Sequence, residues 1–107
     1  MFITVVRLAL KAGTTLAEIS KIYEEHSKSH PEIRGLLTKY YVFGDGKGGA
    51  VYVWKSRADA ERLFTTDWLT TMGARYGSKP EIEWLENPMT VDNSFEQYQT
   101  LAMGLGP

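Results

Sequence analysis

The stretch "KYYVFGDGKGGAVYVW", Lys39–Trp54, decides the fold because it places two apolar runs on either side of a glycine-rich loop. Runs rich in β-branched and aromatic residues and bounded by turn residues predict β-strands. We therefore expect strands at 36–43 and 50–54, joined by a loop whose glycines and Asp45 adopt turn conformations. "GDGKGG" has the glycine density of a phosphate-binding loop, but it joins two strands and lacks the Lys-Ser/Thr pair. We interpret it as a turn.

Two further strands flank this hairpin in the sequence. Residues 2–10, "FITVVRLAL", are rich in β-branched residues and predict a strand that is apolar on both faces apart from Thr4 and Arg7. Residues 81–89 predict a last strand that ends at Asn87-Pro88 or soon after. The hairpin therefore belongs to a sheet of four strands.

A helix should separate the first strand from the hairpin. Thr15 and Glu18 have the S/T-x-x-E spacing of a capping box, which predicts a helix start. The helix should stop near Ser29, because Pro31 disfavours the helical conformation of the residue before it.

A second helical arm should follow the hairpin. Ser56 predicts the start of a helix over "SRADAERLF", and Thr66 predicts a cap for 67–76. Gly77 is a typical C-terminal stop, and we expect a break in the arm at 65–66.

The resulting order, β-α-β-β-α-β, is that of a ferredoxin-like α+β fold with an antiparallel sheet. We expect one domain over 1–93 and a separate tail over 94–107. Ser94 and Gln97 repeat the capping-box spacing, so the tail should form a short helix.

Composition excludes several classes of protein. The 107 residues are 43% hydrophobic and 23% charged, as in ordinary globular domains, and the formal net charge of −1 gives no basic field for nucleic acid or anionic lipid. The absence of cysteine excludes disulfides and thiolate chemistry. We find neither a signal peptide nor an apolar run that could span a membrane, and we expect a cytoplasmic protein.

Strand alternation sorts the hairpin into two faces. Val51 and Val53 form a purely aliphatic pair, so we expect them to face a second copy of the chain, with Tyr52 and Trp54 on the face toward the helices. We place Tyr40 on that helix-facing side as well. The opposite face also holds Leu37, Tyr41 and Phe43, and the simplest cover for it is a homodimer in which two sheets stack.

The order and content of four segments resemble one known family. These are "GLLTKYYVF", "GGAVYVWKSRADAERLF", "DWLTTMGARYGSKPEIEW" and "VDN", and together they extend from Gly35 to Asn93. They resemble the YdhR-like family of proposed monooxygenases. This family belongs to the dimeric α+β barrels, with the antibiotic biosynthesis monooxygenases.

The resemblance implies a homodimer with a pocket between sheet and helices in each subunit. It implies oxygenation, without metal or flavin, of a hydrophobic aromatic or polyketide-like compound. Relatives with this fold also catalyse cyclisation, isomerisation, haem degradation and decarboxylation, so fold alone does not decide the reaction. A cyclase or isomerase, or a small-ligand-binding or stress-response protein without turnover, remains the alternative. The sequence excludes neither.

His26 is the candidate catalytic base. It continues the apolar stripe of the first helix, one turn after Tyr23, and the ordinary pKa of histidine, about 6.5, suits proton abstraction at neutral pH. The alternative is a structural histidine at the border of the core, near the C-terminal end of the helix, where its positive charge would interact favourably with the helix dipole. His26 and His30 are four apart, but Pro31 removes His30 from the helix, so the sequence does not predict a metal site. Haem ligation by one histidine has no support beyond the fold.

Tyr40 is the second candidate catalytic residue, as a hydrogen-bond donor to a substrate oxygen; the alternative is a structural tyrosine.

Trp54 matches the tryptophan that lies near the pocket in related monooxygenases, and its alternative role is in the core. The Trp68 and Met72 side chains should pack on the sheet or cover the pocket. Arg34 could pair with an anionic ligand or with a surface carboxylate. The full set of substrate-binding candidates is Tyr23, Arg34, Tyr52, Trp54, Phe64, Trp68 and Met72.

Overall fold

The computed structural model describes residues 1–28 and 32–93, and the helix predicted for the tail lies outside them. The elements in chain order are β1 (Phe2–Ala9), α1 (Leu16–Lys28), β2 (Leu36–Gly44), β3 (Lys47–Trp54), α2 (Arg57–Leu63), α3 (Thr66–Tyr76) and β4 (Glu81–Glu86). The predicted β-α-β-β-α-β order is confirmed, with the second helical arm divided into two helices. The last strand is shorter than predicted and ends at Glu86, not Met89.

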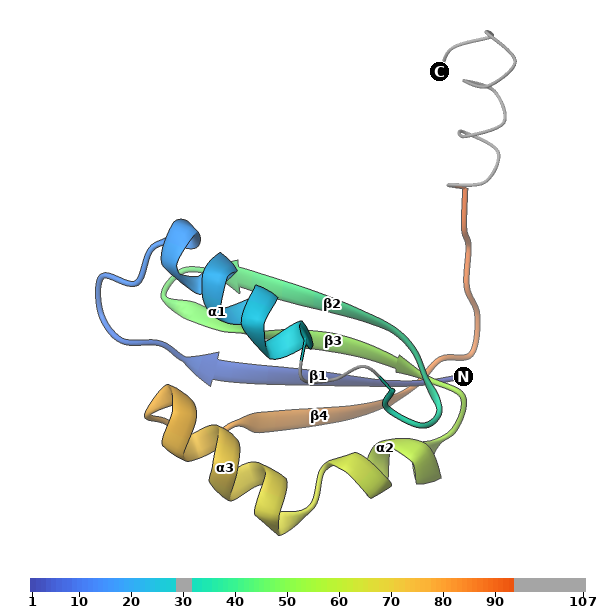
Figure 1. Cartoon of the computed structure of the whole chain (residues 1–107). Helices are drawn as coiled ribbons and strands as arrows, with labels where there is room; N and C mark the ends of the chain where they lie inside the picture. The colour runs from blue at the N-terminus through green and yellow to red at the C-terminus, as the bar shows by residue number, and fades with distance from the viewer. Residues whose placement is uncertain (29–31, 94–107) are drawn as a thin grey trace, which may run out of the picture.

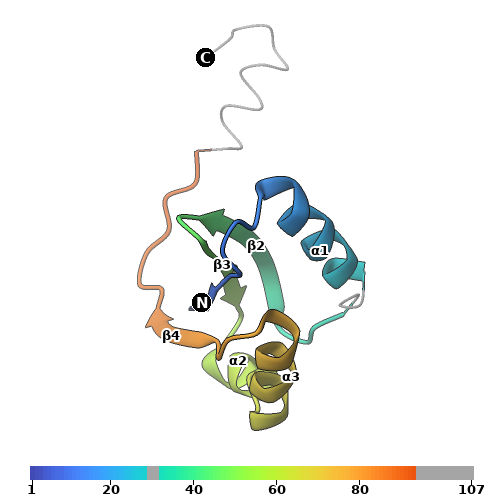
Figure 2. The same cartoon turned by 90° about the vertical axis from the view of Figure 1, so that its left-hand side faces the viewer.

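The four strands form one antiparallel sheet in the order β2-β3-β1-β4. This is the strand order of the ferredoxin-like fold, in which the second strand of each half is an edge strand. The helices lie on one side of the sheet, with α1 over β2 and β3 and α3 beside β4 (Figures 1 and 2). Within residues 1–28 and 32–93, no helix lies over the other side of the sheet (Figure 2).

Side-chain caps define the helix ends. The Thr15 hydroxyl accepts a hydrogen bond from the Glu18 backbone N–H at 3.1 Å, as the capping box requires. Ser56 caps α2 in the same way. The cap of α3 is Thr65, one residue before the predicted Thr66, because the Thr65 hydroxyl accepts from the Trp68 N–H. Gly77 ends α3 in the left-handed conformation, as predicted.

The hairpin turn is tighter than the sequence analysis expected. Gly44 pairs directly with Lys47, so only Asp45 and Gly46 form the turn, with φ angles of 50° and 72°. Positive φ at both central positions is the requirement of a type I′ turn. The third strand therefore begins at Lys47 and not at residue 50.

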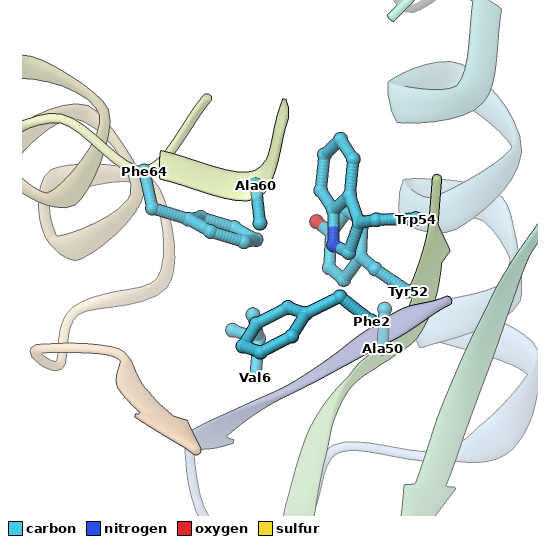
Figure 3. Close-up of a cluster of buried hydrophobic side chains, with 7 residues drawn as sticks. All are labelled: Phe2, Val6, Ala50, Tyr52, Trp54, Ala60 and Phe64. Atoms are coloured by element: carbon cyan, nitrogen blue, oxygen red, sulfur yellow. The ribbon is translucent and has the colours of Figure 1, made fainter. Parts of the chain in front are cut away.

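The core lies between the sheet and the helices. Phe2, Thr4, Val6 and Leu8 alternate along β1 and are buried. Trp54 is completely buried; it stacks on Tyr52 at 5.6 Å and donates a hydrogen bond from Nε1 to the Thr4 hydroxyl at 2.9 Å. The buried apolar cluster comprises Phe2, Val6, Ala50, Tyr52, Trp54, Ala60 and Phe64 (Figure 3). Tyr52 and Trp54 thus face the helices, as predicted.

The expectation that Tyr40 faces the helices is wrong. Tyr40 pairs across the hairpin with Val51, and directly opposed residues of antiparallel strands point to the same face. Val51 lies on the face without helices, so Tyr40 does too, and its side chain is 59% exposed. Tyr41 pairs with Ala50 and points toward the helices instead. The two-residue turn, which fixes this register, is the physical reason.

Candidate functional site

A cavity lies where the inner face of the sheet meets α1 and α3. Its wall combines aliphatic and aromatic side chains with one histidine and one lysine, contributed by three strands and two helices. The lining residues are Val6, Leu8, Tyr23, His26, Lys39, Tyr41, Gly49, Ala50, Tyr52, Trp68, Met72 and Tyr76. Five of the nine residues predicted for the site are among them: His26, Tyr23, Tyr52, Trp68 and Met72.

The enclosed part of the cavity is small. It measures about 20 Å³, which is room for about one water molecule. Together with its open mouth the empty space reaches about 290 Å³. A ligand of aromatic size therefore needs wall side chains to move, and Met72, an unbranched and flexible residue, lies on this wall.

Aromatic rings dominate the cavity wall. The Tyr23 and Tyr41 rings lie 4.7 Å apart, and the His26 ring meets Tyr41 edge-on at 6.2 Å. Burial raises the pKa of Tyr23, Tyr41, Tyr52 and Tyr76 above the ordinary value of 10. These hydroxyls therefore keep their protons at neutral pH and can act as hydrogen-bond donors.

His26 is buried at the junction of α1 and α3. Its Nδ1 lies 2.8 Å from Arg75 Nη1 and 3.4 Å from the Tyr76 hydroxyl. A guanidinium has only donors, so Nδ1 accepts and the neutral ring carries its proton on Nε2. Proton abstraction by Nδ1 consequently requires the Arg75 hydrogen bond to open. The Arg75 side chain is exposed, so it has room to turn toward solvent.

The Tyr23 hydroxyl makes two hydrogen bonds to the backbone of the hairpin. It donates to the Val42 carbonyl oxygen at 2.8 Å and accepts from the Gly49 N–H at 2.9 Å. A Cβ on Gly48 would collide with this hydroxyl, which explains why the strand carries glycine there. Tyr23 thus contributes its ring to the cavity, while its hydroxyl joins α1 to the sheet.

Lys39 is a site residue that the sequence analysis missed. Its Nζ lies 4.2 Å from the centroid of the Tyr41 ring and 4.6 Å from that of the Tyr52 ring. Desolvation by burial lowers the pKa of Lys39 to about 8. The sequence signal that could have located it is the Asp45-Gly46 turn, which puts Lys39 opposite Tyr52 in the ladder.

Two buried donors on the cavity wall have no hydrogen-bond partner in the described part of the chain. They are the Tyr41 hydroxyl and the Trp68 indole N–H. Leaving a buried polar group unsatisfied costs about 1–3 kcal/mol. A ligand or water that offers an acceptor would recover this free energy.

The other predicted site residues lie away from the cavity. Trp54 and Phe64 are buried in the core, where Phe64 meets the Trp54 ring edge-on at 5.8 Å. Arg34 is exposed before β2, and its charge helps to lower the pKa of Asp59 after the larger effects of Arg62 and Ser56. Tyr40 is on the opposite face of the sheet.

No group of three or more histidine, aspartate or glutamate residues within 1–28 and 32–93 is arranged to hold a metal ion. Among the same residues, no helix is both long and apolar enough to cross a bilayer.

Comparison with known proteins identifies the fold. No protein-family model matches the sequence, and no curated protein is significantly similar to it. A solved structure of a protein of unknown function from Nitrosomonas europaea is similar, with a TM-score of 0.64 and 20% identity over 85% of this chain and 92% of that one. A proposed antibiotic biosynthesis monooxygenase from Deinococcus radiodurans has a TM-score of 0.63 and 13% identity over 86% and 97% of the two chains.

SnoaB, a cofactor-independent oxygenase from Streptomyces nogalater, is a third similar structure. Its TM-score is 0.60, with 15% identity over 84% of this chain and 95% of SnoaB. Identities this low demonstrate a common fold and not a common reaction. The chain therefore has the ferredoxin-like α+β fold that these solved structures share, as its sequence predicts.

Proposed function

We propose that the chain is a small oxygenase of the YdhR-like type, which uses dioxygen without a metal or flavin to oxidise a hydrophobic aromatic or polyketide-like compound. The aromatic-walled cavity between sheet and helices carries this proposal, because it offers apolar surface together with a few polar groups. The fold shared with SnoaB supports the same reaction class.

The chemistry needs an electron-rich substrate that supplies its own electrons. A base removes a proton from an activated CH₂ group, and the carbanion forms a bond to dioxygen to give, after protonation, a hydroperoxide. Loss of water from the hydroperoxide leaves a ketone, so one oxygen atom ends in the product and the other in water. The protein orients the substrate, excludes bulk water and donates hydrogen bonds to the developing oxyanion.

The cavity residues suit these roles in different ways. His26 is the proposed base, acting through Nδ1 when Arg75 turns away. Tyr41 takes the donor role that the sequence analysis gave to Tyr40, since its hydroxyl is buried on the cavity wall. Tyr52 and Trp68 supply apolar surface for a flat ring.

Oxygen consumption tests this proposal directly. We expect oxygen uptake with at least one member of a panel of anthrones, hydroquinones and phenols, with product formation abolished under nitrogen. His26→Ala should lower kcat by about 100-fold or more if the histidine is the base. Arg75→Met is the matched variant: it removes the Arg75 hydrogen bond to Nδ1 and should maintain or raise kcat. Loss of activity in Arg75→Met but not in His26→Ala would exclude His26 as the base.

The alternatives give different results in the same assay. A cyclase or isomerase of this fold would form product equally well under nitrogen. A ligand-binding or stress-response protein would bind a panel member without any chemical change. Either outcome would contradict the oxygenase.

We further propose a homodimer formed by the face of the sheet opposite the described helices. The side chains of Ile3, Val5, Val51 and Val53 lie on this face, and Tyr40, Val42 and Leu85 are exposed on it. An apolar sheet face of this kind is typical of a surface that packs against another sheet. The only ion pair found on it within the described residues joins Arg7 and Glu83 at its margin, at 3.2 Å.

Sedimentation analysis of one substitution on each side of the molecule tests the dimer. Tyr40→Glu places a charge on the apolar face and should convert a dimer to monomers. Ile22→Glu makes the same kind of change on an exposed position of α1 and should leave the dimer intact. A wild-type protein that sediments as a monomer at all concentrations would overturn the proposal.

A cytoplasmic location stays a prediction, which fractionation of cells would test.

A further inference from the structure

Lys39 is held on the cavity wall by two aromatic rings. It lies on the helix-facing row of β2, and its Nζ is within 5 Å of the centroids of both the Tyr41 and Tyr52 rings, at 4.2 and 4.6 Å. The face of an aromatic ring attracts a cation, so these rings favour an ammonium at this position. The lysine is therefore part of the cavity wall, with its ammonium over aromatic rings.

This cation has no counter-ion in the described part of the chain. The ion pairs found there join other residues, and neither aspartate nor glutamate lines the cavity. The titratable groups that do line it are Tyr23, His26, Tyr41, Tyr52 and Tyr76. Burial without a compensating anion is also the cause of the lowered pKa of Lys39. An anionic ligand would supply the missing charge.

The two unsatisfied donors on the same wall point to an oxygen acceptor. The Tyr41 hydroxyl and the Trp68 indole N–H are buried and line the cavity with Lys39. An anionic oxygen accepts several hydrogen bonds, and bonds to a charged acceptor are the stronger ones. Val6, Leu8 and Met72 give the same wall apolar surface, which suits the hydrophobic body of a ligand.

We propose that the cavity binds a flat hydrophobic molecule as its oxyanion, an ionised phenol or enol, with the anionic oxygen at Lys39 Nζ and the ring between the aromatic side chains. This inference rests on the proposed function only in taking the cavity as the substrate site, and it does not require oxygenation. One lysine in a small apolar cavity matches a single negative charge. A phosphate ester carries two negative charges, which one lysine does not balance.

The test uses 4-nitrophenol, whose anion alone absorbs visible light, and 4-nitroanisole, its neutral methyl ether. We expect the wild-type protein to bind the phenolate more tightly than the ether and to favour ionisation of the bound phenol. Lys39→Met should weaken phenolate binding by about 10- to 100-fold and leave ether binding within about threefold. Lys39→Arg, which keeps the positive charge, should retain most of the phenolate affinity.

Lys21→Met is the matched control, because it removes one positive charge from an exposed position of α1. It should change neither affinity, and circular dichroism of each variant reports whether the fold is intact. Equal binding of the two probes by the wild type, unchanged phenolate binding in Lys39→Met, or no binding of either probe would each overturn the inference. Phenolate binding without oxygen uptake from any substrate would leave it standing and remove the oxygenase instead.

Discussion

The two faces of the sheet differ in chemistry although the same strands build both. The inner face carries Tyr41, Tyr52 and Trp54 together with Lys39, while the outer face carries Val51 and other aliphatic side chains. Adjacent residues such as Tyr40 and Tyr41 therefore have opposite environments. We propose the inner face, where helices exclude water, for the ligand site and the outer face for contact with another sheet.

The largest difference between the faces should appear in stability. Trp54→Ala removes a completely buried ring and the partner of Thr4, and should lower the free energy of unfolding by about 3–5 kcal/mol. Val53→Ala, next to it on the outer face, should cost about 1 kcal/mol under conditions in which the chain is monomeric. Urea denaturation measures both. Equal losses of unfolding free energy in Trp54→Ala and Val53→Ala would mean that the inner face is not the main core.

A second effect concerns the close approach of the β1 and β3 backbones at Gly49. Gly49 has a φ of 139°, and a Cβ there would collide with the Val6 carbonyl oxygen. Gly49→Ala should therefore cost about 2–3 kcal/mol. Gly44→Ala is the matched control, since a Cβ at Gly44 meets nothing within 4 Å and no left-handed φ is needed. A neutral Gly49→Ala in the same denaturation experiment would contradict the described strand geometry.

Tyr23→Phe should have a smaller effect. It keeps the cavity wall but leaves the buried Gly49 N–H without its acceptor and removes the bond to the Val42 carbonyl. We expect a loss of about 1–2 kcal/mol in the free energy of unfolding. Tyr40→Phe, which removes a hydroxyl from the exposed outer face, should be close to neutral. A larger loss of unfolding free energy in Tyr40→Phe than in Tyr23→Phe would contradict the hydrogen bonds described for Tyr23.

The smallest expected effect is a pH dependence from Lys39. Its folded pKa of about 8 is below the unfolded value of 10.5, so unfolding takes up a proton between these pH values. The stability contributed by this residue therefore rises with pH through that window and is constant below it. The difference in unfolding free energy between wild type and Lys39→Met should thus move in favour of the wild type from about pH 7 to about pH 9.5. A constant difference would show that Lys39 is not desolvated.

The pKa values of the cavity tyrosines are raised as well, and these residues add a pH dependence of their own at the upper end of the window. A folded pKa above 10 means that the folded state holds these protons more tightly than the unfolded state does. Their stabilising contribution is complete below pH 10 and is lost as the pH rises further. Wild type and Lys39→Met share these tyrosines, so the tyrosine contribution cancels in the difference between the two proteins, and we expect the change in that difference to reflect Lys39.

The sequence by itself determined the element order, because capping residues and β-branched runs act locally. Thr15, Ser56 and Gly77 mark helix ends through bonds to neighbours within a few residues. The direction of Tyr52 and Trp54 also followed from alternation along one strand.

Only the tertiary structure decided which residues of different elements meet. The direction of Tyr40 depended on the cross-strand register, and a turn of two residues instead of a longer loop reversed it. The contacts of His26 with Arg75 and of Lys39 with Tyr52 join positions that no local pattern relates. The physical reason is that charge and burial at the cavity come from the packing of α1 and α3 on the sheet, which sequence spacing does not encode.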